Sequence, residues 1–246
     1  MGANGFGQRI TEGALRRTTS FYYRRWGGRL SPQERERASL LWERWGFSVP
    51  EEGASIDGSA LFSHAIDHLA VEIGFGAGEH LVWQALRYPH WGFIGCECHR
   101  QGLWRLLRDI DSYGIGNIRL CAQDGSLLLS ALQDGTVHRF FTLFPDPWPK
   151  QRHRKRRLIC PSFVSEVMRT MAVAGSWRFA SDRACACAHV RDALREQSHG
   201  ALQACWRGAP HVHDWPSTRY QKKAQDTGRI VEFLSIGHQE SQEGAP

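Results

Sequence analysis

Apolar runs of strand length alternate with amphipathic runs of helix length from residue 68 onward. The candidate strands span residues 69–74, 92–97, 117–122, 139–144, 176–181, 202–206 and 229–236. The candidate helices in this region span residues 79–87, 100–113, 125–132, 161–173 and 184–197. Strand–helix alternation at this spacing predicts an α/β fold, with a mostly parallel seven-stranded sheet and helices on both faces. The last two strands, which follow a different spacing, can pair antiparallel at one edge.

The first 60 residues differ from the rest of the chain in being polar and rich in arginine. Within them, Ser31 and Glu34 bracket Pro32 in the pattern of a helix N-cap, a proline at the first helical position and a capping acid. The pattern predicts a helix from Pro32 to about Trp45. We therefore divide the chain into a basic N-terminal arm with a helix (1–60), an α/β domain (61–238) and a polar, disordered tail (239–246).

Size and charge narrow the class of protein. A chain of 246 residues fits one large domain with an arm, and a net charge of +6 favours a nucleic acid or an anionic membrane as partner. No apolar run approaches the roughly 20 residues of a membrane span, and residues 1–10 lack the apolar region of a signal peptide. We expect a cytoplasmic protein that does not enter membranes.

The cysteines do not have the spacing of a metal site. The seven cysteines are scattered, and their only close pairs are Cys96 with Cys98 and Cys185 with Cys187. Zinc ribbons use Cys-x-x-Cys pairs, whereas Cys-x-Cys on a strand places both thiols on one face, where they pack. We expect no bound metal.

A glycine-rich turn follows the first predicted strand. Gly74, Gly76 and Gly78 alternate with other residues and lead into the first helix of the domain, and Glu72 precedes them by two positions. Glycines let the backbone turn sharply and approach a ligand closely, and a helix N-terminus offers free N–H groups. A diphosphate cofactor would be repelled by Glu72, whereas the sulfonium and amino groups of S-adenosylmethionine would be attracted by it. A tight turn without a ligand is the alternative interpretation.

Acidic residues end the next two strands as well. Glu97 lies nineteen positions beyond Gly78, where an acid can accept hydrogen bonds from both ribose hydroxyls of a nucleoside. Asp124 ends the third strand, where its carboxylate can accept from an adenine amino group. Because parallel strands end at one edge of the sheet, these acids favour a nucleoside cofactor bound there.

Asp146 stands between two prolines and directly before a basic strip. Pro145 and Pro147 restrict the backbone on both sides of the carboxylate. Six of the eight residues from Lys150 to Arg157 carry permanent positive charge. Such an arrangement suits an enzyme that grips a polyanion and presents one reactive atom to a fixed acid, with the RNA backbone contacted by Arg154, Lys155 and Arg156. The alternatives are an acid that only shapes a turn and a solvated basic face.

Together these motifs resemble the tRNA (guanine-N7)-methyltransferase family over roughly residues 16–236. The resemblance rests on the Glu72 glycine loop, the Gly95-Cys96-Glu97 strand end, the Asp124 turn, residues 144–150, the 152–158 strip, Phe179-Ala180-Ser181-Asp182 and Thr218-Arg219-Tyr220. It implies a Rossmann-like class I methyltransferase fold, in which residues 61–238 form the S-adenosylmethionine-dependent domain. The sequence departs from the family at Gln221, where a glutamate is usual, and at residues 183–187.

The resemblance also implies roles for individual residues. Asp146 would be catalytic. The cofactor contacts would be Glu72, Glu97, Asp124 and Asp146, beside the loop glycines Gly74, Gly76 and Gly78. The tRNA contacts would be Lys150, Asp182, Thr218, Arg219, Tyr220 and Gln221, and the product would be 7-methylguanosine, in the variable loop.

The chemistry of guanine agrees with this interpretation. Guanine N7 carries a lone pair and no proton, so its methylation needs no general base, and the sequence has no obvious Cys/His or Ser/His pair. Alignment and electrostatics would then supply catalysis, with Asp146 stabilising positive charge on the purine or holding the base. Two alternatives are an NAD(P)-dependent oxidoreductase and a noncatalytic RNA-binding protein. Either a monomer or a homodimer is compatible with the sequence.

Overall fold

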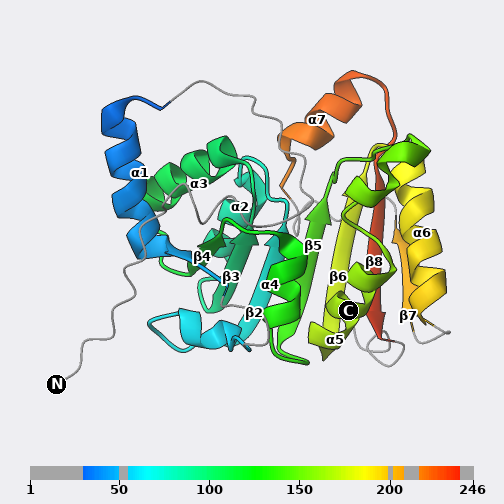
Figure 1. The fold of residues 1–246 in the computed structure, drawn as a ribbon, viewed down its shortest axis with the longest axis horizontal. Helices are drawn as coiled ribbons and strands as arrows, with labels where there is room; N and C mark the ends of the chain where they lie inside the picture. The colour runs from blue at the N-terminus through cyan, green and yellow to red at the C-terminus, as the bar shows by residue number, and fades with distance from the viewer. Residues whose placement is uncertain (1–29, 50–54, 199–201, 208–215, 239–246) are drawn as a thin grey trace.

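The computed structural model describes residues 30–49, 55–198, 202–207 and 216–238 (Figure 1). The predicted arm before residue 30 and the predicted tail lie outside these residues. The described part forms one sheet flanked by helices, and Figure 1 shows the strands side by side across the molecule.

The sheet has eight strands in the order β1-β4-β3-β2-β5-β6-β8-β7. The strands are β1 (Gly46–Phe47), β2 (His68–Ile73), β3 (Trp91–Cys96), β4 (Ile118–Cys121), β5 (Val137–Leu143), β6 (Met171–Ser181), β7 (Leu202–Arg207) and β8 (Glu232–His238). All pairings from β1 to β6 are parallel, and β8 pairs antiparallel with both β6 and β7. The predicted α/β class and all seven predicted strands are confirmed. The two-residue edge strand β1 was not predicted.

The helices also follow the predicted pattern with two exceptions. They are α1 (Pro32–Trp45), α2 (Glu79–Arg87), α3 (Arg100–Tyr113), α4 (Gly125–Ala131), α5 (Pro161–Thr170), α6 (Ala184–Ser198) and α7 (Arg219–Asp226), with 3-10 turns η2 (Gly58–Leu61) and η3 (Gln151–Arg156). The prediction that α5 runs to residue 173 is wrong, because Met171 already pairs with Val137 of β5. The second exception, α7, was not predicted at all.

The start of α1 shows how local sequence determines an element. The Ser31 hydroxyl accepts from the Glu34 N–H at 3.2 Å, and the Glu34 carboxylate accepts from the Ser31 N–H at 2.8 Å. This reciprocal capping box satisfies two N–H groups that a helix end otherwise leaves without partners. Pro32 follows at the first helical position, as the sequence predicted.

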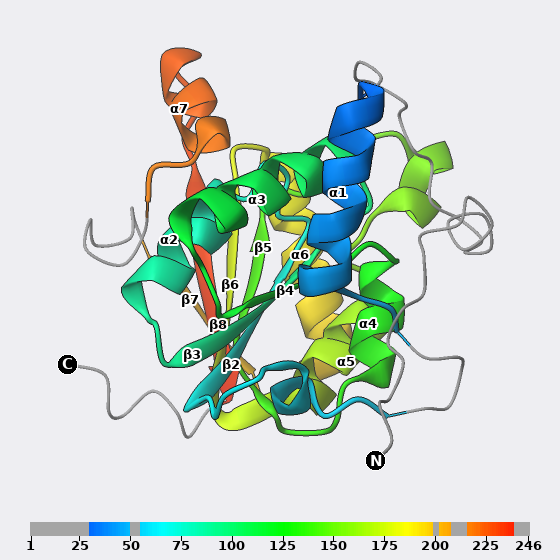
Figure 2. The same ribbon diagram turned by 90° about the vertical axis from the view of Figure 1, so that its left-hand side faces the viewer.

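Each face of the sheet carries its own apolar core. In β2, Leu69, Val71 and Ile73 pack with the buried side of α4, α5 and α6, whereas Ala70 packs with α1, α2 and α3. This follows from the two-residue period of a strand, which sends successive side chains to opposite faces. Figure 2 shows α2 and α3 on one side of the sheet and α4 and α5 on the other.

The strand order reverses between β2 and β5. From β2 the chain proceeds outward through β3 and β4, and β5 then pairs on the other side of β2. The loops after β2 and β5 therefore leave in opposite directions, and a crevice opens at the carboxyl ends of these strands. Open α/β sheets bind their ligands at such a switch point.

Candidate functional site

A cavity of about 640 Å³ opens at this switch point. The loop after β2 contributes Gly74 and Gly76, and Glu97 follows directly after the end of β3. Phe144 and Asp146 come from the loop after β5. A volume of this size is typical of sites for small molecules and cofactors.

The glycine-rich turn forms one wall of this cavity. Gly74, Gly76 and Gly78 have φ angles of 79°, 59° and 82°, in the left-handed region that side chains other than glycine rarely adopt. A fourth glycine, Gly102 in α3, lies against the turn: a β-carbon there would stand 2.0 Å from the Gly76 carbonyl oxygen. Glycine is therefore required on both sides of this contact.

Glu97 ties the glycine turn to the next strand. One carboxylate oxygen accepts from the Gly76 N–H at 2.9 Å and the other accepts from the His99 N–H at 2.9 Å. Burial raises the pKa of the Glu97 carboxyl, and the two backbone donors act in the opposite direction. Glu97 thus lines the cavity as a partly buried acceptor whose position is set by two backbone bonds.

Two predicted acids and one glycine do not line the cavity. Glu72 is only 2% exposed, and its carboxylate lies 2.8 Å from Nδ1 of the buried His80 in α2. Asp124 caps α4 by accepting from the Ser126 N–H at 2.8 Å, and burial raises the pKa of its carboxyl. Gly78 is buried as the N-cap of α2. Each of these three residues is adjacent in the chain to a lining residue, namely Ile73, Ala77 or Gly125.

Asp146 lies exposed at the lip of the cavity, in a strained loop. Phe144 and Trp148, on either side of it, have φ angles of 51° and 34° and are the non-glycine residues with positive φ among those described. Such conformations cost about 1–3 kcal/mol each and persist only where surrounding contacts maintain them. One such contact is the Phe144 N–H, which donates to the Ala180 carbonyl of β6 at 2.7 Å.

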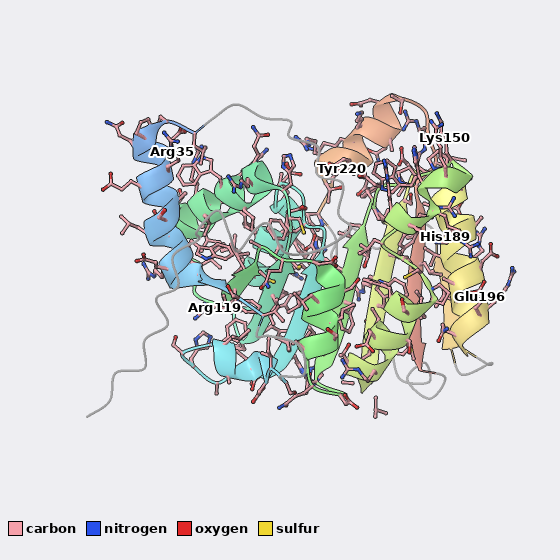
Figure 3. The ribbon with its side chains drawn as sticks, viewed as in Figure 1. Arg35, Arg119, Lys150, His189, Glu196 and Tyr220 are labelled. Atoms are coloured by element: carbon pink, nitrogen blue, oxygen red, sulfur yellow. The ribbon has the colours of Figure 1, made fainter. Side chains whose placement is uncertain are left out.

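The basic strip folds mostly into η3, beside the cavity. Lys150, Arg154 and Lys155 are exposed, whereas Arg156 is partly buried and lines the cavity. The Arg156 guanidinium stands over the Trp148 ring, 4.9 Å from its centroid. Figure 3 shows Lys150 and Tyr220 at the same end of the molecule, above the carboxyl ends of the parallel strands.

The short helix α7 brings the predicted Thr218–Gln221 segment to the cavity. Thr218 caps the helix, the Arg219 N–H donates to Glu79 of α2 at 2.9 Å, and Tyr220 stacks on Phe144 with ring centroids 5.9 Å apart. Arg219 and Tyr220 line the cavity. The Gln221 side-chain oxygen is buried without a hydrogen-bond partner among the described residues.

Asp182 does not line the cavity and forms a salt bridge with Arg229. Its carboxylate lies 2.6 Å from the Arg229 guanidinium, just after α7. The sequence reasoning did not single out Phe144 or Gly102, although both carry signals. Phe144 opens the proline-rich motif, and Gly102 is a glycine inside an amphipathic helix, which often marks a close contact.

The described ranges contain neither a metal-binding cluster nor a membrane-spanning helix. No three His, Cys, Asp or Glu side chains gather there in a position to hold a metal, and no helix there is long and apolar enough to cross a membrane. The thiols of Cys96 and Cys98 both donate to the Gln123 carbonyl, at 3.2 Å and 3.0 Å.

Comparison with known proteins places the site in context. Residues 67–234 match a family model described as a putative methyltransferase. A tRNA (guanine-N(7)-)-methyltransferase from Nitrobacter hamburgensis is 39% identical over 87% of this chain and 85% of its own length. One of the same name from Rhodospirillum rubrum is 42% identical over 74% of this chain and 72% of its own. One solved structure, an rRNA methylase from Streptococcus thermophilus, is more distant: it is 11% identical over 71% of this chain and 88% of its own, with a TM-score of 0.48.

Proposed function

The chain belongs to the tRNA (guanine-N7)-methyltransferase family, and we propose that the cavity at its switch point is the site where methyl transfer takes place. The reaction moves the methyl group of S-adenosylmethionine to N7 of a guanosine in tRNA. The observation that supports this location is the Glu97 carboxylate, held by the Gly76 and His99 N–H groups inside a cavity of about 640 Å³.

The residues of the cavity fit the cofactor. Gly74 and Gly76 lack side chains where the methionine part would pass, and Glu97 offers lone pairs to two ribose hydroxyls. Gly125, at the start of α4, lines the cavity, and Asp124 precedes it as the N-cap of the same helix. The adenine would lie at this position, next to the Asp124 carboxylate. Glu72, buried behind the turn, would contribute negative charge toward the sulfonium and amino groups.

Methylation of guanine N7 depends on the positioning of the reactants more than on proton transfer. When bound, the cofactor would supply an electrophilic methyl group. The N7 lone pair of guanine would form the new N–C bond while the methyl–sulfur bond breaks and S-adenosylhomocysteine leaves, and no proton would have to be removed from N7. As the purine becomes positively charged, a fixed carboxylate at Asp146 would stabilise that charge or hold the base through its N–H groups. The strained loop keeps this carboxylate at the cavity lip, where alignment alone can contribute several kcal/mol to catalysis.

The tRNA would lie across the mouth of the cavity. Lys150, Arg154, Lys155 and Arg156 would contact its phosphates. Helix α7, whose Arg219 and Tyr220 also line the cavity, would contact it through Thr218, Arg219, Tyr220 and Gln221, with Asp182 acting through Arg229 just after the helix. We further propose that the modified guanosine lies in the variable loop and that the protein works in the cytoplasm, as a monomer or homodimer.

One experiment tests the proposal directly. The protein is incubated with unmodified tRNA and methyl-labelled S-adenosylmethionine, and the label is mapped to a nucleotide and an atom. Label at guanine N7 is the expected result. Binding of tRNA without transfer of label would favour the noncatalytic RNA-binding alternative, and tight binding of NADPH in a fluorescence titration would favour the oxidoreductase.

A further inference from the structure

Arg157, the last residue of the basic strip, makes its hydrogen bonds to the protein itself. Its Nε donates to the Trp148 carbonyl at 3.1 Å and its Nη2 to the Pro149 carbonyl at 3.5 Å. Its Nη1 lies 3.4 Å from Nδ1 of His189 in α6. Arg157 is partly buried, unlike Arg154 and Lys155, which are exposed.

The contacts of His189 determine which of its ring nitrogens carries the proton. Its Nε2 lies 2.6 Å from the Ile159 carbonyl, an atom that can only accept, so Nε2 must be the donor. Its Nδ1 faces the Arg157 guanidinium, a group that can only donate, so Nδ1 must be the acceptor. His189 is therefore neutral in this arrangement and connects Arg157 to the backbone before α5.

The chain of bonds ends in the loop that carries Asp146. Trp148, whose carbonyl receives the Arg157 bond, has the strained φ angle of 34°. A small cavity of about 20 Å³ lies behind the loop, and Asp146, Arg157 and His189 all line it. Arg157 and His189 thus contact the loop from the small cavity, whereas the large cavity is lined by Tyr220 and by neither of them.

We propose that Arg157 and His189 are positioning residues, which hold the loop of Asp146 in its strained conformation and so place that carboxylate for methyl transfer. The inference rests on the proposed role of Asp146. It separates Arg157 from its neighbours in the strip: Arg154 and Lys155 would contribute charge to tRNA binding, whereas Arg157 would contribute geometry to the chemical step. The planar fork of arginine suits this role, because its Nε and Nη1 contact the Trp148 carbonyl and His189 from two separate nitrogens, a geometry that the single nitrogen of a lysine does not reproduce.

A dependence on pH follows from the neutral state of His189. Burial lowers the pKa of the His189 ring, the neighbouring Arg157 and Arg154 lower it further, and the Ile159 carbonyl and Asp192 act in the opposite direction. Above this depressed pKa, Nδ1 accepts from Arg157. As the pH falls through it, Nδ1 becomes protonated, repels the guanidinium and releases the loop, so kcat should decline on the acid side.

The test compares Arg157→Lys with Arg154→Ala in steady-state methylation of tRNA. Arg157→Lys keeps the charge and should lower kcat at saturating tRNA by about ten- to a hundredfold, the scale of a loop misplaced by about 1 Å. Arg154→Ala should act mainly on the KM for tRNA. Cofactor binding and thermal unfolding of each variant show whether the fold is intact. A kcat for Arg157→Lys equal to that of the wild type, or an effect on KM alone, would overturn the proposal.

A second variant gives an independent outcome if Arg157→Lys is too unstable to assay. In His189→Gln, the amide can donate to the Ile159 carbonyl and accept from Arg157 without titrating, so the decline of kcat at acid pH should become weaker. An acid decline identical to that of the wild type would contradict the role of His189. Wild-type protein that transfers no methyl group would instead refute the proposed function itself, so the two failures are distinguishable.

Discussion

Replacing Gly102 by alanine tests whether the glycine turn is the cofactor wall. Helix propensity alone favours the change, because alanine in a helix interior is about 1 kcal/mol better than glycine. The structure indicates the opposite effect on function. The new β-carbon would stand 2.0 Å from the Gly76 carbonyl oxygen, whereas real β-carbons essentially never approach closer than 3.0 Å.

The magnitude follows from that distance. Raising 2.0 Å to 3.0 Å requires the turn or α3 to move by about 1 Å, and both are backbone, which has no flexible end to give way. Gly76 also donates to Glu97, so the displacement would disturb the expected ribose acceptor. We expect the Kd for S-adenosylmethionine to rise at least about tenfold, or about 1.4 kcal/mol. Overpacking of about 1–3 kcal/mol should also cancel or exceed the gain in helix propensity.

The assay is isothermal titration with S-adenosylmethionine, together with thermal unfolding of the free protein. Gly116→Ala serves as the control, because a β-carbon at Gly116 meets no atom within 4 Å. Gly116→Ala should bind the cofactor as the wild type does. A folded Gly102→Ala variant with a wild-type Kd would refute the reasoning, since the turn would then tolerate displacement or lie away from the cofactor.

Three further predictions concern the acids and the basic strip. Asp146→Asn should lower kcat by about 10²–10³-fold, the scale of one lost electrostatic group, while the cofactor Kd changes little; equal loss in both would assign Asp146 to binding. Replacing Arg154, Lys155 and Arg156 by alanine should reduce the salt slope of tRNA binding by up to about 2–3 units, and an unchanged slope would count against phosphate contacts. Because burial raises the pKa of Glu97, the cofactor Kd should increase as the pH falls toward that pKa and the carboxylate gains a proton. In Glu97→Gln, titration calorimetry across pH should find this dependence gone.

Features that depend on neighbouring residues could be predicted from the sequence. The capping residues Ser31 and Glu34 marked the start of α1 correctly because both bonds close within three positions. The apolar run at residues 69–74 correctly indicated a strand, and five of the six residues of β2 are buried. Glu97 and Asp124 were expected at one edge because parallel strands end together. Glu97 lines the cavity, whereas Asp124 caps α4 one residue away from the lining residue Gly125.

The polar helix α7 could not be predicted from local sequence patterns. Helix α7 has eight residues, of which Ala224 is the buried one, so its apolar pattern is too short to distinguish a helix from a polar loop. Its position comes from the bond between Arg219 and Glu79, 140 positions apart, and from the stack of Tyr220 on Phe144. The end of α5 likewise depends on a distant segment. Met171 pairs with Val137 of β5, so the chain enters a strand at this residue and the helix ends before it.

The sequence by itself determined the order of the main strands and helices, though not β1 or α7, together with the acids at the strand ends and the charge of the strip, because periodicity, capping and strand direction are local properties. Only the tertiary structure decided which partner each charged group meets: His80 for Glu72, Arg229 for Asp182, and the Trp148 carbonyl for Arg157. These pairings arise when packing brings separate segments within about 3 Å, the range over which a hydrogen bond forms. A charge can be read from the chain, but its role depends on the distance to its neighbours.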